Sequence, residues 1–107
     1  GQVDGGYAQG LGYTLFEEMV WDDGRLANPT LMDYKAPGTA EVPYEIDTTI
    51  VEHPEPDGPF GAKGVGEITL VTVPASIANA ITHASCLRLR KLPLSPERVL
   101  NGLMENE

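Results

Sequence analysis

The segment GQVDGGYAQGLGYTL, residues 1–15, combines a helical pattern of apolar side chains with an unusual number of glycines. Apolar residues recur in it at intervals of four, at Val3, Tyr7, Leu11 and Leu15. This spacing places them on one face of a helix. Each glycine inside a helix costs roughly 1 kcal/mol relative to alanine, so a free surface helix would not be expected to hold several. The segment therefore predicts a helix against which another backbone, or a bound ligand, packs at short range.

Two further segments predict helices. Val73, Ile77 and Ile81 repeat at intervals of four, and a threonine and a proline at the start of this segment form a start signal. Residues 95–97 are serine, proline and glutamate: a capping hydroxyl, a proline suited to the first turn, and a carboxylate near the positive end of a helix. They predict a final helix that runs through about Met104.

The remaining pattern favours short strands. Residues 18–21 and 25–27 flank the turn signal Asp-Asp-Gly at 22–24, which predicts a hairpin. Residues 42–51 alternate between apolar and polar side chains, and leucines alternate with arginines over residues 87–90, so we expect a strand in each. Helices and strands interleave too irregularly for a doubly wound parallel sheet. The predicted fold class is therefore α+β, with mixed helices and short strands.

Composition limits the function classes that remain. The 107 residues are 41% hydrophobic, enough for a single modest domain, and the chain begins Gly1-Gln2, which suggests part of a longer chain. The net charge of −9 disfavours nucleic acid and anionic membrane surfaces as partners. The apolar run at residues 68–75 is far too short to span a bilayer, so we expect no membrane insertion. The single cysteine, Cys86, permits no internal disulfide and fits a reducing, cytoplasmic location.

The segment GPFGAKGVGE, residues 58–67, is the strongest candidate for chemistry. It fails as a phosphate-binding loop because Glu67 stands where that motif needs lysine, and it lacks the third glycine of a dinucleotide fingerprint. What remains is a loop whose backbone can approach a ligand closely, ending on a carboxylate between Gly66 and the apolar residues 68–71. A carboxylate in apolar surroundings accepts protons more readily. Glu67 is accordingly a candidate general base, with a surface carboxylate or a helix-approach charge as the alternatives.

Several segments together resemble one protein family. They are GQVDGGYAQGLGYTLFEE (1–18), NPTLMDYKAP (28–37), GPFGAKGVGE (58–67), PASIANAI (74–81) and RLRKLPLSPERVL (88–100). In this order they resemble the C-terminal part of the molybdopterin-binding large subunit of the xanthine dehydrogenase and aldehyde oxidase family of molybdenum hydroxylases. The resemblance covers nearly the whole chain, and it implies that residues 1–107 are one fragment of a molybdopterin-binding domain.

The resemblance also implies an activity. Members of this family hydroxylate a carbon centre of an aldehyde, a purine or a related heterocycle with oxygen derived from water. Glu67 would then be the catalytic general base, and no residue of this chain would ligate the metal directly. The residues that would contact the molybdopterin cofactor are Gln2, Lys63, Gly64, Val65 and Gly66.

The implied partners lie outside these residues. The chain has no cysteine pattern for iron-sulfur clusters and no flavin fingerprint, so iron-sulfur clusters and FAD are expected on other domains or subunits. The chain would need these, the remainder of the molybdenum subunit and a small-molecule substrate, and would be inactive alone. Two alternatives remain open: a non-catalytic acidic interaction module derived from the same domain, and a small acid/base enzyme that uses Glu67 alone.

Overall fold

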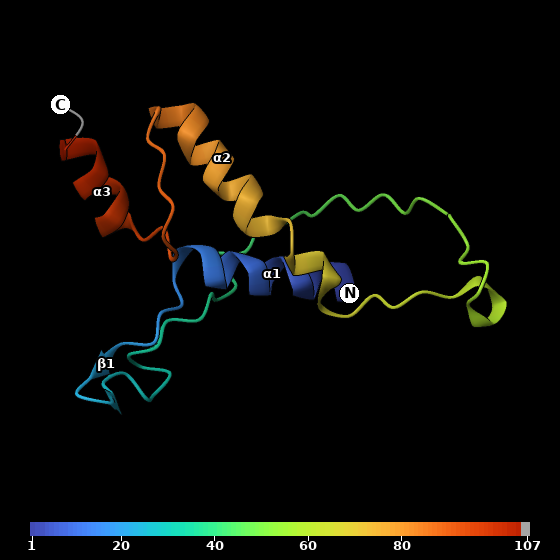
Figure 1. The fold of residues 1–107 in the computed structure, drawn as a ribbon, viewed down its shortest axis with the longest axis horizontal. Helices are drawn as coiled ribbons and strands as arrows, with labels where there is room; N and C mark the ends of the chain where they lie inside the picture. Colours follow the sequence, from blue (N-terminus) through green and yellow to red (C-terminus); the bar gives the residue numbers. More distant parts are fainter. Residues whose placement is uncertain (106–107) are drawn as a thin grey trace.

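The computed structural model describes residues 1–105, in which helices predominate and the only sheet is a two-stranded hairpin (Figure 1). The elements in chain order are α1 (Gln2–Leu15), β1 (Trp21–Asp22), β2 (Arg25–Leu26), the 3₁₀ helices η1 (Pro59–Gly61) and η2 (Glu67–Leu70), α2 (Val73–Ser85) and α3 (Pro96–Glu105). The predicted α+β class and all three predicted helices are confirmed. The start signals also hold: Thr72 is the N-cap of α2, and Ser95 Oγ accepts a hydrogen bond from the Arg98 N–H in the first turn of α3.

The glycines of α1 admit the close contact that the sequence predicted. A Cβ atom at Gly6 would overlap Thr69 Oγ1 and lie 2.9 Å from Thr69 Cβ, and one at Gly10 would lie 2.7 Å from Val73 Cβ. Real Cβ atoms essentially never approach so closely, so both positions need glycine as long as η2 and the start of α2 lie where they do. Figure 1 shows η2 lying along α1 near its N-terminal end, with α2 rising from the same region. Another part of the chain, rather than a ligand, therefore occupies this face of α1.

The predicted hairpin is confirmed, in a shorter form. Its two strands pair antiparallel, with Trp21 opposite Leu26. Asp23 and Gly24 both adopt positive φ, 43° and 78°, which is the pattern of a type I′ turn. The side chain of Asn28 closes the base of the hairpin by accepting from the Val20 N–H at 2.9 Å and donating to a main-chain carbonyl at 2.7 Å.

The two other predicted strands are wrong. Residues 42–51 and 87–90 belong to no strand in the structure. Alternation gives a segment two different faces, but a strand also needs a neighbour that satisfies its backbone N–H and C=O groups. Among residues 1–105 neither segment has such a neighbour, and residues 46–49 line a groove beside α1 and α2 without pairing as a strand.

The C-terminal segment returns to the end of α1. Thr14 is fully buried there, its hydroxyl donates to the Gly10 carbonyl at 2.6 Å, and its own carbonyl accepts from the Leu94 N–H. Arg98 of α3 pairs with Glu18, just after α1. The buried apolar side chains of the described chain are Leu11, Val73, Leu87 and Leu94. This small core therefore joins α1 to the start of α2 and to the segment before α3.

A hydrogen bond and a close packing contact hold the segment after the hairpin against the end of α1. Tyr34 donates its hydroxyl proton to Glu17 Oε2, and Pro37 lies so close to Gly12 that a Cβ there would stand 2.9 Å from Pro37 Cδ. The hydrogen bond to the Glu17 carboxylate, with smaller contributions from burial and the charge of that carboxylate, raises the pKa of Tyr34 to about 12. The neutral phenol is therefore the form that the fold stabilises.

The chain is extended for its length. Its radius of gyration is 17.3 Å, against about 13 Å expected for a compact domain of this size. Large apolar side chains such as Met32, Tyr44 and Phe60 are almost completely exposed. No helix within residues 1–105 combines the length and apolar character required to cross a membrane.

The contact between α1 and η2/α2 predicts opposite effects for two glycines of one helix. Gly10→Ala should destabilise the protein by about 1–3 kcal/mol, because the new methyl group meets the rigid Cβ of Val73. Gly5→Ala should stabilise it by about 0.5–1 kcal/mol, because a Cβ at Gly5 meets nothing within 4 Å. Thermal unfolding of the purified full-length protein measures both. Equal effects at the two positions would contradict the close contact of Gly10 with Val73.

The hydrogen bond from Tyr34 to Glu17 predicts that the stability of the protein depends on pH. Tyr34→Phe should cost about 1 kcal/mol at neutral pH, since it removes the donor to Glu17. Because the pKa in the folded protein, about 12, lies above the ordinary value of 10.0, the stabilisation is complete below pH 10 and declines as the pH rises toward 12. The difference in melting temperature between wild type and variant should narrow over that range. Tyr44→Phe, at a fully exposed tyrosine, is the matched control and should show no such trend.

Candidate functional site

Glu67 is the first residue of η2 and lies beside α1. Its side chain is exposed, and its Oε1 accepts a hydrogen bond of 3.1 Å from Nε2 of Gln9, a half-buried residue in the middle of α1. The same Nε2 donates to the Tyr13 hydroxyl at 3.3 Å, one helical turn further along. Among residues 1–105 Glu67 forms no ion pair, so Gln9 is its one side-chain partner in this part of the chain.

The expectation that apolar neighbours would desolvate Glu67 is wrong for the described chain. Ile68 and Val71, which follow it, are themselves 65% and 66% exposed. The tight 3₁₀ turn carries these side chains outward instead of folding them over the carboxylate. Within these residues, then, Glu67 is open to solvent on one side and supported by α1 on the other.

The glycine loop before Glu67 is extended and exposed. No backbone–backbone hydrogen bond of residues 1–105 involves residues 63–66, and a Cβ at Gly64 or Gly66 would meet no atom within 4 Å. Lys63 borders a small hollow of about 260 Å³ together with His53 and Gly61. This loop therefore presents open backbone with N–H donors that the described chain does not use.

Gln2 lies at the N-terminal end of α1, apart from that loop. Its carbonyl accepts a 3.4 Å hydrogen bond from Thr69 Oγ1, two residues beyond Glu67, and its side chain is exposed. The structure thus brings Gln2 and Glu67 to the same edge of α1, through Thr69 and Gln9, but among the described residues Gln2 forms no hydrogen bond with residues 63–66.

Sequence reasoning missed Gln9. A signal for it existed, because Gln9 lies seven residues after Gln2 and so shares a face of the helix with it. Gln9 is also three residues from Gly6 and next to Gly10, the two glycines that η2 and α2 touch. A polar side chain beside a close-packing glycine is positioned to reach the element that packs there.

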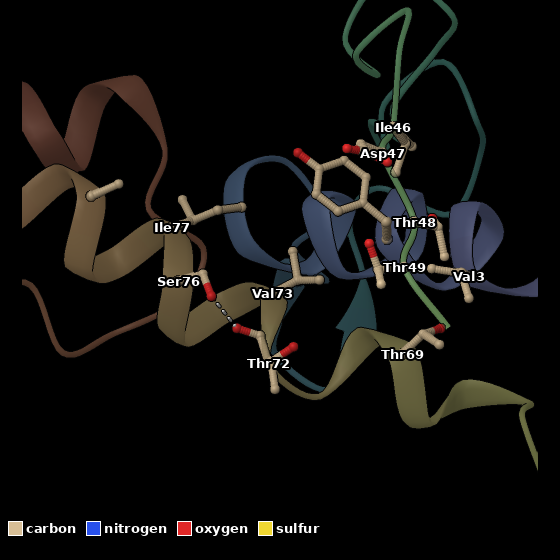
Figure 2. Close-up of a pocket in the computed structure, with 12 residues that line it drawn as sticks. Val3, Ile46, Asp47, Thr48, Thr49, Thr69, Thr72, Val73, Ser76 and Ile77 are labelled. Atoms are coloured by element: carbon tan, nitrogen blue, oxygen red, sulfur yellow. Dashed lines mark hydrogen bonds between the residues drawn. The ribbon is translucent and has the colours of Figure 1, made fainter. Parts of the chain in front are cut away.

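A groove of about 570 Å³ lies on another side of the contact between α1 and α2 (Figure 2). It is lined mainly by hydroxyl-bearing and apolar side chains, among them Tyr7, Thr48, Thr49, Thr72 and Ile77. Ser76 also borders it, but its hydroxyl already donates to the Thr72 carbonyl at 2.9 Å. Neither Glu67 nor any predicted cofactor-contacting residue lines this groove, so it is distinct from the candidate site.

Direct metal ligation has no obvious candidate in the described part of the chain. No group of three or more His, Cys, Asp or Glu side chains is arranged there to hold a metal ion. The candidate site instead offers the carboxylate of Glu67, the exposed side-chain amide of Gln2 and the open backbone N–H groups of residues 63–66. Such a set suits a polar organic group that carries its own metal.

Comparison with known proteins identifies the family. Residues 1–43 match the molybdopterin cofactor-binding domain family. Aldehyde oxidoreductase from Megalodesulfovibrio gigas is 44% identical over 103 residues, which cover 96% of this chain and 11% of that protein. A putative xanthine dehydrogenase molybdenum-binding subunit from Escherichia coli is 41% identical over 101 residues, covering 92% of this chain and 13% of the relative.

Solved structures show the same relationship. The crystal structure of quinoline 2-oxidoreductase from Pseudomonas putida superposes with a TM-score of 0.88 at 38% identity, over 97% of this chain and 14% of that one. Aldehyde oxidoreductase from Desulfovibrio gigas gives 0.85 at 42% identity, over 96% of this chain and 11% of that one. These matches support a fragment of the molybdenum-binding subunit of the xanthine dehydrogenase and aldehyde oxidase family. The chain spans between a tenth and a seventh of the length of these relatives.

Proposed function

We propose that this chain contributes the general base and part of the cofactor-binding surface of a molybdenum hydroxylase that oxidises a carbon centre with oxygen from water. The observation that carries the proposal is the setting of Glu67. Its carboxylate is held on one oxygen by Gln9, and its other oxygen has no hydrogen-bond partner among residues 1–105. A base needs one oxygen fixed for orientation and one available for the proton.

The glycine loop fits a role in binding molybdopterin. The backbone of Lys63, Gly64, Val65 and Gly66 is exposed, and at the two glycines nothing in the chain would obstruct a close approach. Gln2 offers a second polar contact from the start of α1. When bound, the cofactor supplies the metal centre that receives the electrons of the oxidation. The residues of this chain then bind and orient that group, and Glu67 takes the proton from the attacking oxygen at its free carboxylate oxygen.

The exposed apolar surface supports action within a larger assembly. A compact protein of 11.5 kDa exposes about 5,800 Å², whereas this chain exposes 8508 Å². Leu31, Met32 and Phe60 are at least 83% exposed, far from the usual behaviour of such side chains in a free protein. We infer that the remainder of the molybdenum subunit covers them, and that iron-sulfur and flavin subunits or domains carry the electrons onward.

The alternative, a non-catalytic acidic module, predicts a different metal content for the purified protein. A docking module would be isolated without molybdenum, whereas the hydroxylase should contain about one molybdenum per molybdenum subunit and copurify with iron-sulfur and flavin centres. The exposed surface of the chain also includes large apolar side chains along residues 31–60, which a module acting through its net charge would not need.

Glu67→Gln tests the catalytic role. The variant keeps an oxygen that can accept the hydrogen bond from Gln9, but it cannot take up a proton at neutral pH. We expect turnover to fall by about 10²–10⁴-fold with molybdenum content unchanged. Glu45→Gln, the same change at another exposed glutamate, is the matched control and should retain full turnover. Normal turnover in Glu67→Gln would remove the assignment.

Gly64→Ala tests the loop. Because a Cβ at Gly64 meets nothing in the chain, the folding stability should not change by more than about 0.5 kcal/mol. If the cofactor lies against this backbone, the added methyl group should lower the molybdopterin content of the purified protein. Gly5→Ala, equally open but on α1, controls for an unspecific effect of the methyl group. Full cofactor content in Gly64→Ala would place the cofactor away from this residue.

A further inference from the structure

The main chain is anchored on only one side of Glu67. Two residues after it, Thr69 packs against Gly6 of α1 and donates to the Gln2 carbonyl, so the chain is fixed from that point onward. Before it, residues 63–66 have no backbone–backbone hydrogen bond among residues 1–105. Glu67 therefore stands at the boundary between an anchored helix and an open loop, where its main chain alone does not determine the direction of a long, flexible side chain.

Gln9, on α1, restricts the direction of the Glu67 side chain through its hydrogen bond to Oε1. Its Cα lies on α1 between Gly6 and Gly10, which are in close contact with Thr69 and Val73, so its distance from η2 is set by packing. Its Nε2 carries two N–H groups, and the structure gives this nitrogen two acceptors, Glu67 Oε1 and the Tyr13 hydroxyl. An amide held at two points is a more rigid support than one that reaches the carboxylate alone.

We propose that Gln9 is a positioning residue that orients the carboxylate of Glu67 for proton transfer. This inference rests on the proposed function of Glu67. The amide donates to Oε1 and so leaves Oε2 to face the reacting atoms. Both side chains are accessible to solvent, so the hydrogen bond contributes little to folding and its effect lies in orientation.

The test uses the complete, cofactor-loaded enzyme with Gln9→Met, which keeps the length of the side chain and removes its N–H groups. Misplacing a catalytic group by about 1 Å costs on the order of 10²-fold in rate, so we expect kcat to fall between about tenfold and a hundredfold. KM should stay within about twofold, because Gln9 acts through Glu67 and not through bound substrate. Molybdenum content should match that of wild type.

A readout independent of turnover is the crystal structure of the loaded Gln9→Met enzyme. We expect the Glu67 carboxylate to leave its wild-type rotamer or to divide between rotamers, while the backbone of α1 and η2 stays in place. A single, unchanged Glu67 rotamer together with wild-type kcat would overturn the inference. If Gln9→Met loads poorly, Gln9→Asn replaces it, because its amide is one methylene too short to span the 3.1 Å contact.

Combining variants separates this inference from the proposed function. If Gln9 acts through Glu67, then Gln9→Met should cause no further loss of kcat in a Glu67→Gln background, whereas independent effects would multiply. Gly5→Ala, on the open side of α1, should leave kcat unchanged in both backgrounds. Normal turnover in Glu67→Gln alone would refute the proposed function. Full loss in Glu67→Gln with wild-type kcat in Gln9→Met would refute only the positioning role.

Discussion

The rest of the structure depends on the close contact between α1 and the chain from Thr69 to Val73. Gly6 and Gly10 have no side chain, so η2 and the first turn of α2 lie directly on the backbone of α1. One contact thereby fixes the direction in which α2 leaves α1, the location of the small core around Leu11, and the end of the glycine loop that carries the candidate base. Glycine in a helix is unfavourable on its own, and here the packing that it admits compensates for that cost.

The same contact gives the candidate site two unlike halves. Glu67 and Gln9 belong to the packed half, where a helix and a 3₁₀ turn hold the candidate base and its hydrogen-bond partner together. Residues 63–66 belong to the open half, where backbone is exposed and uncrowded. A base must be oriented, while a surface that receives a large cofactor must be accessible, and a short anchored turn after a glycine loop meets both needs within a few residues.

The sequence predicts this architecture well where the cause is local. Periodicity located α1 and α2, the start signal at residues 95–97 located α3, and Asp23-Gly24 located the hairpin turn, because each pattern acts within a few residues. It failed at residues 42–51, where alternation is real but a strand needs a partner that residues 1–105 do not provide. It also missed the contact between Gln9 and Glu67, because that contact depends on how η2 packs against α1 after folding, and it left open whether Glu67 is a surface carboxylate.

The buried apolar side chains lie among the helices, whereas the segment of residues 31–60 exposes large apolar side chains. Among residues 1–105, the buried apolar side chains Leu11, Val73 and Leu94 lie in α1, at the start of α2 and just before α3, and Leu87 lies after α2 against α3. Residues 31–60, in contrast, expose Met32, Tyr44 and Phe60 almost completely. The side-chain hydrogen bonds of Asn28 at the base of the hairpin and the hydrogen bond from Tyr34 to Glu17 order the start of this exposed segment, which has no core of its own. A segment that is locally ordered and apolar on its surface is suited to be covered by other parts of a larger protein. Its packing there would then determine how far the glycine loop, which follows it directly, can move relative to the anchored carboxylate.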